Sequence, residues 1–188
     1  MGYNTLALAH ALIRRYVKPG AHCIDATAGR GRDTALLCAC AGTEGKVWAF
    51  DIQPEAIEQT RALLAQNGQT AQVILDSHAN MEHYVPPASI DCIVFNFGRL
   101  PGGDPNIVTT AQTSITAIEV GLRLLKPGGV MSLSLYYGGA NGYEERDAIL
   151  DYLRTLDDKK YAILVGDWVN RKHDPPIPIV IWKEATAD

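Results

Sequence analysis

The sequence predicts an α/β fold in which a seven-stranded, mostly parallel sheet carries helices on both faces. Short apolar runs typical of strands alternate with helical stretches along the chain, which is the pattern of strand–helix–strand units. The runs are nearly continuously apolar, as expected for strands that are covered on both faces. The last two runs lie too close together for a crossover helix, so they should pair as a hairpin that makes one strand antiparallel.

Capping residues, glycines and prolines set the expected bounds of each element. Helices are expected over residues 6–17, 32–41, 54–67, 109–125 and 143–156. Strands are expected over residues 22–26, 46–51, 71–75, 90–95, 130–136, 161–168 and 177–182. A loop with a short helix should join the third and fourth strands. Because no linker or repeat interrupts this order, we expect one domain over residues 1–188, with an N-terminal helix in residues 1–20 and the core in residues 21–188.

Composition excludes several classes of protein. The 188 residues carry a net charge of -4, which argues against a general nucleic-acid coat protein but leaves room for a local basic patch. The basic residues expected on such a rim are Arg14, Arg15, Lys18, Arg99, Arg171 and Lys172. No apolar run reaches the roughly 18 residues of a membrane span and the start lacks a signal-peptide pattern, so we expect a cytoplasmic protein without a membrane partner.

Four cysteines lie in apolar stretches without the C-x-x-C spacing of many metal and redox sites. We interpret them as buried, reduced thiols, and a metal site at Cys38 and Cys40 is the less favoured alternative. No metal is expected.

The glycine turn after the first strand indicates a ligand site. Asp25 ends a β-rich run, the turn contains Gly29 and Gly31, and a helix follows, an arrangement that lets a ligand approach the main chain. Asp51 lies twenty residues beyond Gly31, about the offset at which a carboxylate meets ribose hydroxyls. The alternative interpretations are that Asp25 caps the turn and that Asp51 caps the next helix.

The same turn narrows the ligand. A dinucleotide fingerprint needs a third small residue at position 34, where this chain has Thr34, and Asp33 would set a negative charge beside a pyrophosphate. Acids on both sides of the glycines suit a cationic ligand without phosphate, such as S-adenosylmethionine (SAM). A nicotinamide-dependent oxidoreductase is therefore disfavoured.

Polar residues should gather where the parallel strands end, because ligands bind at that edge of open α/β sheets. The residues expected there, after the five strands in turn, are Asp25, Asp51, Asp76, Ser77, His78, Asn96, Tyr136 and Tyr137. His78 is alternatively a loop histidine with a structural partner, and the Arg30 and Arg32 side chains are alternatively solvated charges.

Asn96 is the candidate catalytic residue. It closes a buried strand, and its side-chain carbonyl can accept hydrogen bonds from an amine, which orients the nitrogen lone pair toward an electrophilic methyl group. The alternative is an Asn turn cap. The amine must also lose a proton, and we name His78 as the candidate base because it titrates near neutrality, with solvent as the alternative.

These motifs resemble the class I SAM-dependent methyltransferases, which have a Rossmann-like fold. More closely they resemble the YtqB-type rRNA methylases, a group similar to the MnmM tRNA methyltransferases. The resemblance runs from about His10 to Trp182, and its matching stretches are Asp25–Thr34, Phe50–Gln53, Ser77–His78, Phe95–Asp104, Leu125–Gly129 and Glu144–Glu145. The stretch from Asn96 to Gly103, taken with Ser77–His78, is the most specific to this group.

The resemblance implies roles for individual residues. Asp25 and the Gly29–Gly31 turn would hold the methionine part of SAM, Asp51 would bind the ribose, and Asn96 would face the methyl group. Gln53 and the Ser77–His78 segment would border the adenine. The full set of expected cofactor contacts is Asp25, Thr27, Gly29, Arg30, Gly31, Arg32, Asp33, Thr34, Asp51, Ile52, Gln53, Ser77, His78, Asn96 and Gly98. The expected substrate contacts are Arg99, Leu100, Pro101, Tyr136, Tyr137 and Arg171.

The substrate that the resemblance implies is the wobble uridine in the anticodon stem-loop of tRNA. A 5-aminomethyl group on that uridine, often with a 2-thio group, would become 5-methylaminomethyl. Many members carry a histidine where this chain has Gly139, and Arg30 and Arg99 replace a commoner Asn and Tyr. We therefore expect the contacts to RNA to differ from those of these members. A methyltransferase for rRNA, a protein or a small molecule and a cofactor-binding regulator are the alternatives, and a homodimer is left open.

Overall fold

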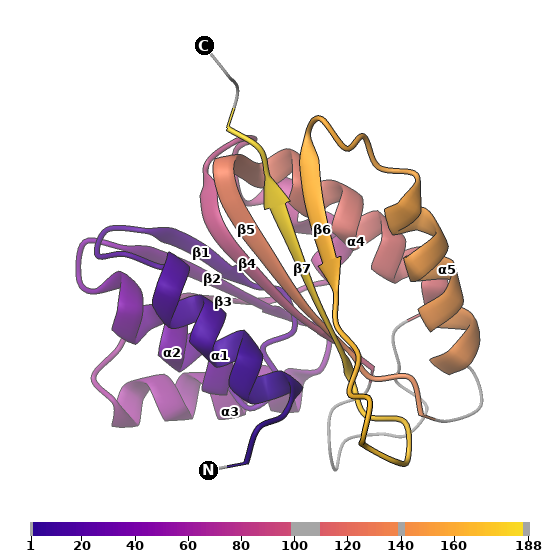
Figure 1. Ribbon diagram of the computed structural model, residues 1–188. Helices are drawn as coiled ribbons and strands as arrows, with labels where there is room; N and C mark the ends of the chain where they lie inside the picture. Colours follow the sequence, from indigo (N-terminus) through magenta and orange to yellow (C-terminus); the bar gives the residue numbers. More distant parts are fainter. Residues whose placement is uncertain (1, 99–109, 139–141, 186–188) are drawn as a thin grey trace.

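The computed structural model describes residues 2–98, 110–138 and 142–185 (Figure 1). The strands are β1 (His22–Asp25), β2 (Lys46–Asp51), β3 (Gln72–Leu75), β4 (Ile90–Phe97), β5 (Leu125–Leu135), β6 (Tyr161–Val165) and β7 (Ile177–Lys183). The helices are α1 (Thr5–Tyr16), α2 (Arg32–Ala41), α3 (Pro54–Gln66), α4 (Ala111–Leu124) and α5 (Gly142–Arg154), with a 3₁₀ helix, η1 (His78–His83), between β3 and β4.

The seven strands form one sheet in the order β3-β2-β1-β4-β5-β7-β6. Strands β1 to β5 pair in parallel, whereas β7 is antiparallel to both of its neighbours, β5 and β6. The arrows of β6 and β7 in Figure 1 accordingly point in opposite directions. The predicted fold class is confirmed, including the C-terminal hairpin.

Helices cover both faces of the sheet. Helices α1, α2 and α3 lie on one face, and α4 and α5 lie on the other (Figure 1). The alternating side chains of β4 explain this layering: Cys92 and Val94 pack with the α1 and α2 side, whereas Ile93 and Phe95 pack with the α4 and α5 side. Strand β4 is thus apolar on both faces, as the continuous apolar run predicts.

Several strands differ in length from the prediction, three of them by more than one residue. Strand β5 begins at Leu125 rather than at residue 130, because Leu125 pairs with Ile90 of β4. Strand β4 continues to Phe97 because Asn96 and Phe97 pair with Ser134 and Leu135 of β5, so Asn96 lies inside the strand rather than in the following loop. Strand β6 ends at Val165 rather than at residue 168. After Val165 only the Gly166 amide continues the pairing, by donating to a carbonyl of β7, and the chain then turns.

Helix α1 is fastened at its start to the loop between β6 and β7. The Thr5 hydroxyl donates to the Pro176 carbonyl and accepts from the Trp168 indole, whose Nε1 lies 2.9 Å away. Farther along, Ile13 is fully buried against the sheet. The first residues of the chain therefore lie beside the carboxyl edge of the parallel strands, at the bottom of Figure 1.

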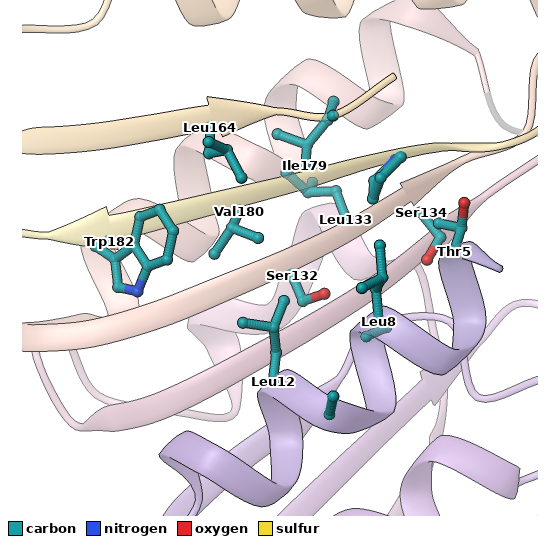
Figure 2. Close-up of a pocket in the computed structure, with 14 residues that line it drawn as sticks. Thr5, Leu8, Leu12, Ser132, Leu133, Ser134, Leu164, Ile179, Val180 and Trp182 are labelled. Atoms are coloured by element: carbon teal, nitrogen blue, oxygen red, sulfur yellow. The ribbon is translucent and has the colours of Figure 1, made fainter. Parts of the chain in front are cut away.

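An apolar groove of about 320 Å³ separates α1 from strands β5, β7 and β6 (Figure 2). Leu8 and Leu12 of α1 form one wall, and Leu133, Val180 and other strand residues form the floor. Leu164 of β6 is 56% exposed, which shows that α1 leaves this end of the sheet face uncovered. Among the described residues, no helix is long and apolar enough to span a membrane.

Candidate active site

The turn after β1 is built around a buried acid. Asp25 ends β1 without exposed surface, and its carboxylate accepts from the Thr34 hydroxyl (2.6 Å) and the Thr27 amide (3.2 Å). Burial, and next the nearby charge of Asp33, raises the pKa of Asp25 to about 7. Thr34 stands where a dinucleotide fingerprint has its third small residue. Here its hydroxyl is used in the hydrogen bond to Asp25.

Glycines shape the rest of this turn. Gly29 and Gly31 have positive φ angles of 53° and 76°, a conformation that favours glycine. A Cβ on Gly31 would come within 2.9 Å of the Thr60 Cα, so the start of α2 sits directly against α3. The residue that caps α2 is Gly31, which has no side chain to bond to the first amides of the helix. This helix end is therefore open to a ligand.

The acid at the end of β2 is held by the main chain on both sides. One oxygen of Asp51 accepts from the Gly29 amide and the other from the Gln53 amide, each at 2.9 Å. The carboxylate is half-buried and keeps free acceptor positions. Ile52 beside it is 55% exposed, so an apolar side chain stands next to the acid at the strand end.

The segment after β3 folds around Asp76. Its carboxylate accepts from Ser77, Asn80 and Tyr84, and the bond from Asn80 contributes most to lowering the pKa of Asp76. Asp76 was expected at the ligand edge. In the structure its carboxylate binds the start of η1, whose N-cap is the neighbouring Ser77.

His78 in the same segment turns inward. Its Nδ1 donates to the Ala26 carbonyl (3.2 Å), and its ring meets Phe95 and Phe97 edge-on. Burial lowers the pKa of His78, which favours the neutral ring with its lone pair on Nε2.

Asn96 joins three elements at the end of β4. Its amide Nδ2 donates to Asp33 Oδ2 (2.8 Å), and its backbone amide donates to the Thr27 hydroxyl (2.7 Å). The other carboxylate oxygen of Asp33 lies 2.7 Å from Nε2 of His10 on α1. Because Nδ2 is bound to Asp33, the side-chain carbonyl oxygen of Asn96 is the group left to accept a bond from a ligand.

No sequence pattern pointed to His10 as a site residue. The histidine lies on the N-terminal helix, 23 residues from its partner, and no spacing rule connects two helices in this way. In the sequence it stands between Ala9 and Ala11, which gives no sign of a functional partner.

The predicted substrate contacts divide into two groups. Tyr136 and Tyr137 follow β5 at the same edge, where a Cβ on Gly98 would come within 2.9 Å of Tyr136. Arg171 lies in the β6–β7 loop, stacked over Trp168 and donating to the Tyr3 carbonyl. The remaining predicted positions, Arg99, Leu100, Pro101 and the substituted Gly139, lie outside the described residues.

The predicted basic rim is wrong in one part. Arg14, Arg15 and Lys18 lie at the end of α1, where Tyr16 contacts Trp182 and Trp182 pairs with Val130 at the start of the apolar part of β5. That is the amino edge of the sheet, opposite to Arg171. The prediction failed because α1 runs away from the site, a direction that the sequence pattern does not reveal.

Comparison with known proteins shows which proteins this chain resembles. The family model described as "Putative rRNA methylase" matches residues 47–182. A chloroplastic tRNA (mnm(5)s(2)U34)-methyltransferase of Arabidopsis thaliana is 32% identical over 190 residues, which cover 93% of this chain and 67% of that protein.

Two solved structures share the fold over nearly their whole length. The "putative rRNA-methylase" of Clostridium thermocellum is 37% identical with a TM-score of 0.94, covering 97% of this chain and 99% of that one. A "putative methyltransferase" of Streptococcus mutans, solved in complex with SAH, is 32% identical with a TM-score of 0.88 and the same coverage.

The sheet order, the glycine turn and the acids at the strand ends, together with these neighbours, define a class I SAM-dependent methyltransferase. Within that class, the chain belongs to the family described as "Putative rRNA methylase". The resemblance drawn from the motifs and the SAM cofactor are confirmed. The open start of α2 and the fixed Asp51 carboxylate fit this cofactor.

The raised pKa of Asp25 predicts that replacing this acid by a neutral residue increases the free energy of unfolding, and that the increase depends on pH. Asp25 keeps its proton longer in the folded state than at its ordinary pKa of 3.8, so its contribution to stability is full below about pH 4 and is lost as the pH rises to about 7. Asp25→Asn should therefore gain stability over the unchanged protein across this range, by at most about 1.4 kcal/mol per pH unit. Urea unfolding of the cofactor-free proteins measures this difference.

Asp76→Asn is the control, because the pKa of Asp76 is shifted in the opposite direction. The Asp76 carboxylate contributes stability above its ordinary pKa, so this variant should lose stability without gaining any as the pH rises. A stability difference for Asp25→Asn that stays constant from pH 4 to 7 contradicts the assignment.

Proposed function

We propose that this chain is a SAM-dependent RNA N-methyltransferase that acts on the wobble uridine of tRNA. Its reaction converts a 5-aminomethyl group, with or without a neighbouring 2-thio group, to 5-methylaminomethyl. The observation that carries the proposal is the fixed amide of Asn96, which presents a carbonyl acceptor at the ligand edge. The name of the Arabidopsis thaliana relative supports the tRNA substrate, and the family description supports RNA more generally, with rRNA as the second candidate.

The cofactor lies, in this proposal, across the carboxyl ends of β1, β2 and β3. Asp25, Thr27 and the Gly29–Gly31 turn hold the methionine part, with Arg30, Arg32, Asp33 and Thr34 around them. Asp51 binds the ribose hydroxyls, since its oxygens are aimed by two main-chain amides. Ile52, Gln53, Ser77 and His78 border the adenine, and Asn96 and Gly98 face the methyl group.

Replacing Asp51 tests this placement. Loss of a charge-assisted pair of hydrogen bonds costs about 1.5–3 kcal/mol, so Asp51→Ala should weaken SAM binding about ten- to a hundredfold. Calorimetric titration with SAM gives the affinity. Asp151→Ala, an exposed acid on α5, serves as the matched control and should bind SAM normally. Equal affinities for the two variants contradict the ribose role of Asp51.

The chain's chemical task is to position an amine. When bound, SAM supplies a methyl group that its sulfonium has already activated. Asn96 Oδ1 accepts from the substrate amine and directs the lone pair, while Asp33 keeps the amide in that orientation. Catalysis by a cysteine is not needed: the four cysteines are free, and burial raises the pKa of Cys38 to about 11 and of Cys92 to about 12.

Removal of the Asn96 side chain tests the positioning. Asn96→Ala should lower kcat about a hundredfold while leaving SAM affinity nearly unchanged, because the lost contact acts in the transition state. Methyl transfer is followed on tRNA that carries 5-aminomethyluridine and on matched tRNA that lacks it. Asn67→Ala, at the end of α3, is the control. Full turnover by Asn96→Ala, or equal transfer to both tRNAs, overturns the proposal.

Aromatic and basic side chains beside the site form a surface suited to RNA. The Arg146 guanidinium lies 5.0 Å from the Tyr137 ring centre and 5.1 Å from that of Tyr143. The Tyr143 hydroxyl donates to Asp174 of the β6–β7 loop (2.6 Å), which also carries Arg171. Stacked aromatic and guanidinium planes bind unpaired bases, as an anticodon loop presents them.

The salt dependence of tRNA binding tests this surface. Neutralising Arg171 and Lys172 together by Gln should reduce the slope of log affinity against log salt by about one to two. The double variant of Arg14 and Arg15 is the control, because these equally exposed residues lie at the opposite edge. If both double variants change the slope equally, the surface is not the RNA site.

The cytoplasmic location and the homodimer stay predictions, and the Arabidopsis thaliana relative is named as chloroplastic.

A further inference from the structure

The N-terminal helix supplies a partner for the acid that holds Asn96. Nε2 of His10 on α1 lies 2.7 Å from Oδ1 of Asp33, and Asn96 Nδ2 donates to Oδ2 of the same carboxylate at 2.8 Å. The Asp33 side chain is 7% exposed, and that of His10 is 24% exposed. One buried carboxylate at the start of α2 thus connects a side chain of α1 with the candidate catalytic amide of β4.

The two contacts decide where the protons of this group lie. A carboxylate only accepts hydrogen bonds, so both of its partners must donate. His10 therefore carries a proton on Nε2 and uses it in the bond to Asp33. Asn96 directs its NH2 group to Asp33, which leaves Oδ1 as the acceptor for an amine. No proton needs to move between these residues for Asn96 to bind that amine.

The side chain of Asn96 depends on this carboxylate, whereas its main chain does not. The backbone amide of Asn96 donates to the Thr27 hydroxyl, and the residue pairs with Ser134 within the sheet. The side-chain amide could still rotate by half a turn, and its NH2 group would then bond to the lone pair that must attack the methyl group. The bond to Asp33 selects the productive orientation.

Asp33 needs its second donor to stay in place. Its Oδ1 is satisfied by His10, and a buried carboxylate oxygen without a donor is costly. Without His10, the Asp33 side chain lowers this cost by rotating toward water or toward a cationic ligand. Such a rotation weakens the bond to Asn96 and releases the amide from its orientation.

Helix α1 is docked by contacts that do not involve His10. Ala9, Ile13 and Val17 are buried on its inner side, and Thr5 bonds to the loop between β6 and β7. Loss of the imidazole should therefore leave the helix in place. The effect of that loss is confined to Asp33 and to the amide that Asp33 holds.

We propose that His10 is a positioning residue for methyl transfer. Its Nε2–H group holds Asp33, and Asp33 holds the Asn96 amide with its oxygen toward the substrate amine. This inference rests on the proposed function. In this role His10 exchanges no proton and acts through Asp33 rather than by touching the cofactor or the substrate. The N-terminal helix is then part of the active site as well as a cover for the sheet.

Two replacements of His10 test this role. His10→Leu removes the donor, whereas His10→Gln removes the ring but keeps an N–H group for Asp33. On aminomethyl tRNA, His10→Leu should lower kcat about tenfold, as expected for one lost hydrogen bond, and His10→Gln should lower it about threefold or less. Calorimetry should find SAM affinities within about threefold of the unchanged protein for both variants. His22→Leu, at the opposite edge of the sheet, is the control and should keep the full kcat.

Double variants show whether His10 acts through Asn96. In an Asn96→Ala background no amide is left to misplace, so adding His10→Leu should lower kcat by no more than about twofold further. A role of His10 in folding or in docking α1 would lower kcat by the same factor in both backgrounds. Equal factors in the two backgrounds, or equal losses for His10→Leu and His10→Gln, overturn the proposal.

A third measurement does not depend on turnover. In the SAH-bound protein without tRNA, NMR should show that the side-chain amide protons of Asn96 exchange with water faster in His10→Leu than in His10→Gln. Asn96→Ala assigns these signals by removing them. Equal exchange in the two His10 variants overturns the positioning role. If the unchanged protein transfers no methyl group to aminomethyl tRNA while this difference is present, the proposed function falls and the link from His10 to Asn96 stands.

Discussion

Parallel pairing of β1 with both β2 and β4 is the constraint on which the site depends. The connections from these central strands leave toward opposite faces of the sheet, so no helix closes over the strand ends between them. The register then sets Asp51 and Asn96 at the same height, because Asp25 pairs opposite Ala49 and Val94, which lie two residues before Asp51 and Asn96. The functional groups meet because the sheet, rather than any loop, fixes their heights.

Three acids, Asp25, Asp33 and Asp51, gather at this edge. Burial, and then the charges of Asp33 and Asp51, raise the pKa of Asp25 to about 7. A cationic ligand relieves this repulsion when it binds. The edge therefore selects for positive charge before any shape is recognised, which suits both a sulfonium cofactor and an ammonium substrate.

Much of this arrangement could be predicted from the sequence because it follows from local rules. Strand ends, the glycine turn and the acid offset depend on neighbours within about twenty residues. The His10–Asp33 contact and the wrong placement of Arg14 both depend on how α1 packs, which is set by distant residues. The shortened β6 likewise depends on pairing with β7. Sequence patterns report what an element is, and tertiary packing decides where it points.

The attachment of α1 to the β6–β7 loop joins parts of the chain that are far apart in the sequence. Thr5 and Tyr3 bond to Pro176, Trp168 and Arg171, which lie 163 to 171 residues away. Contacts of such high sequence separation slow folding, because the entropy of closing a long loop is lost before the contacts form. The His10–Asp33 contact depends on the same docking of α1, so the polar contacts of the site are complete only once this long loop has closed.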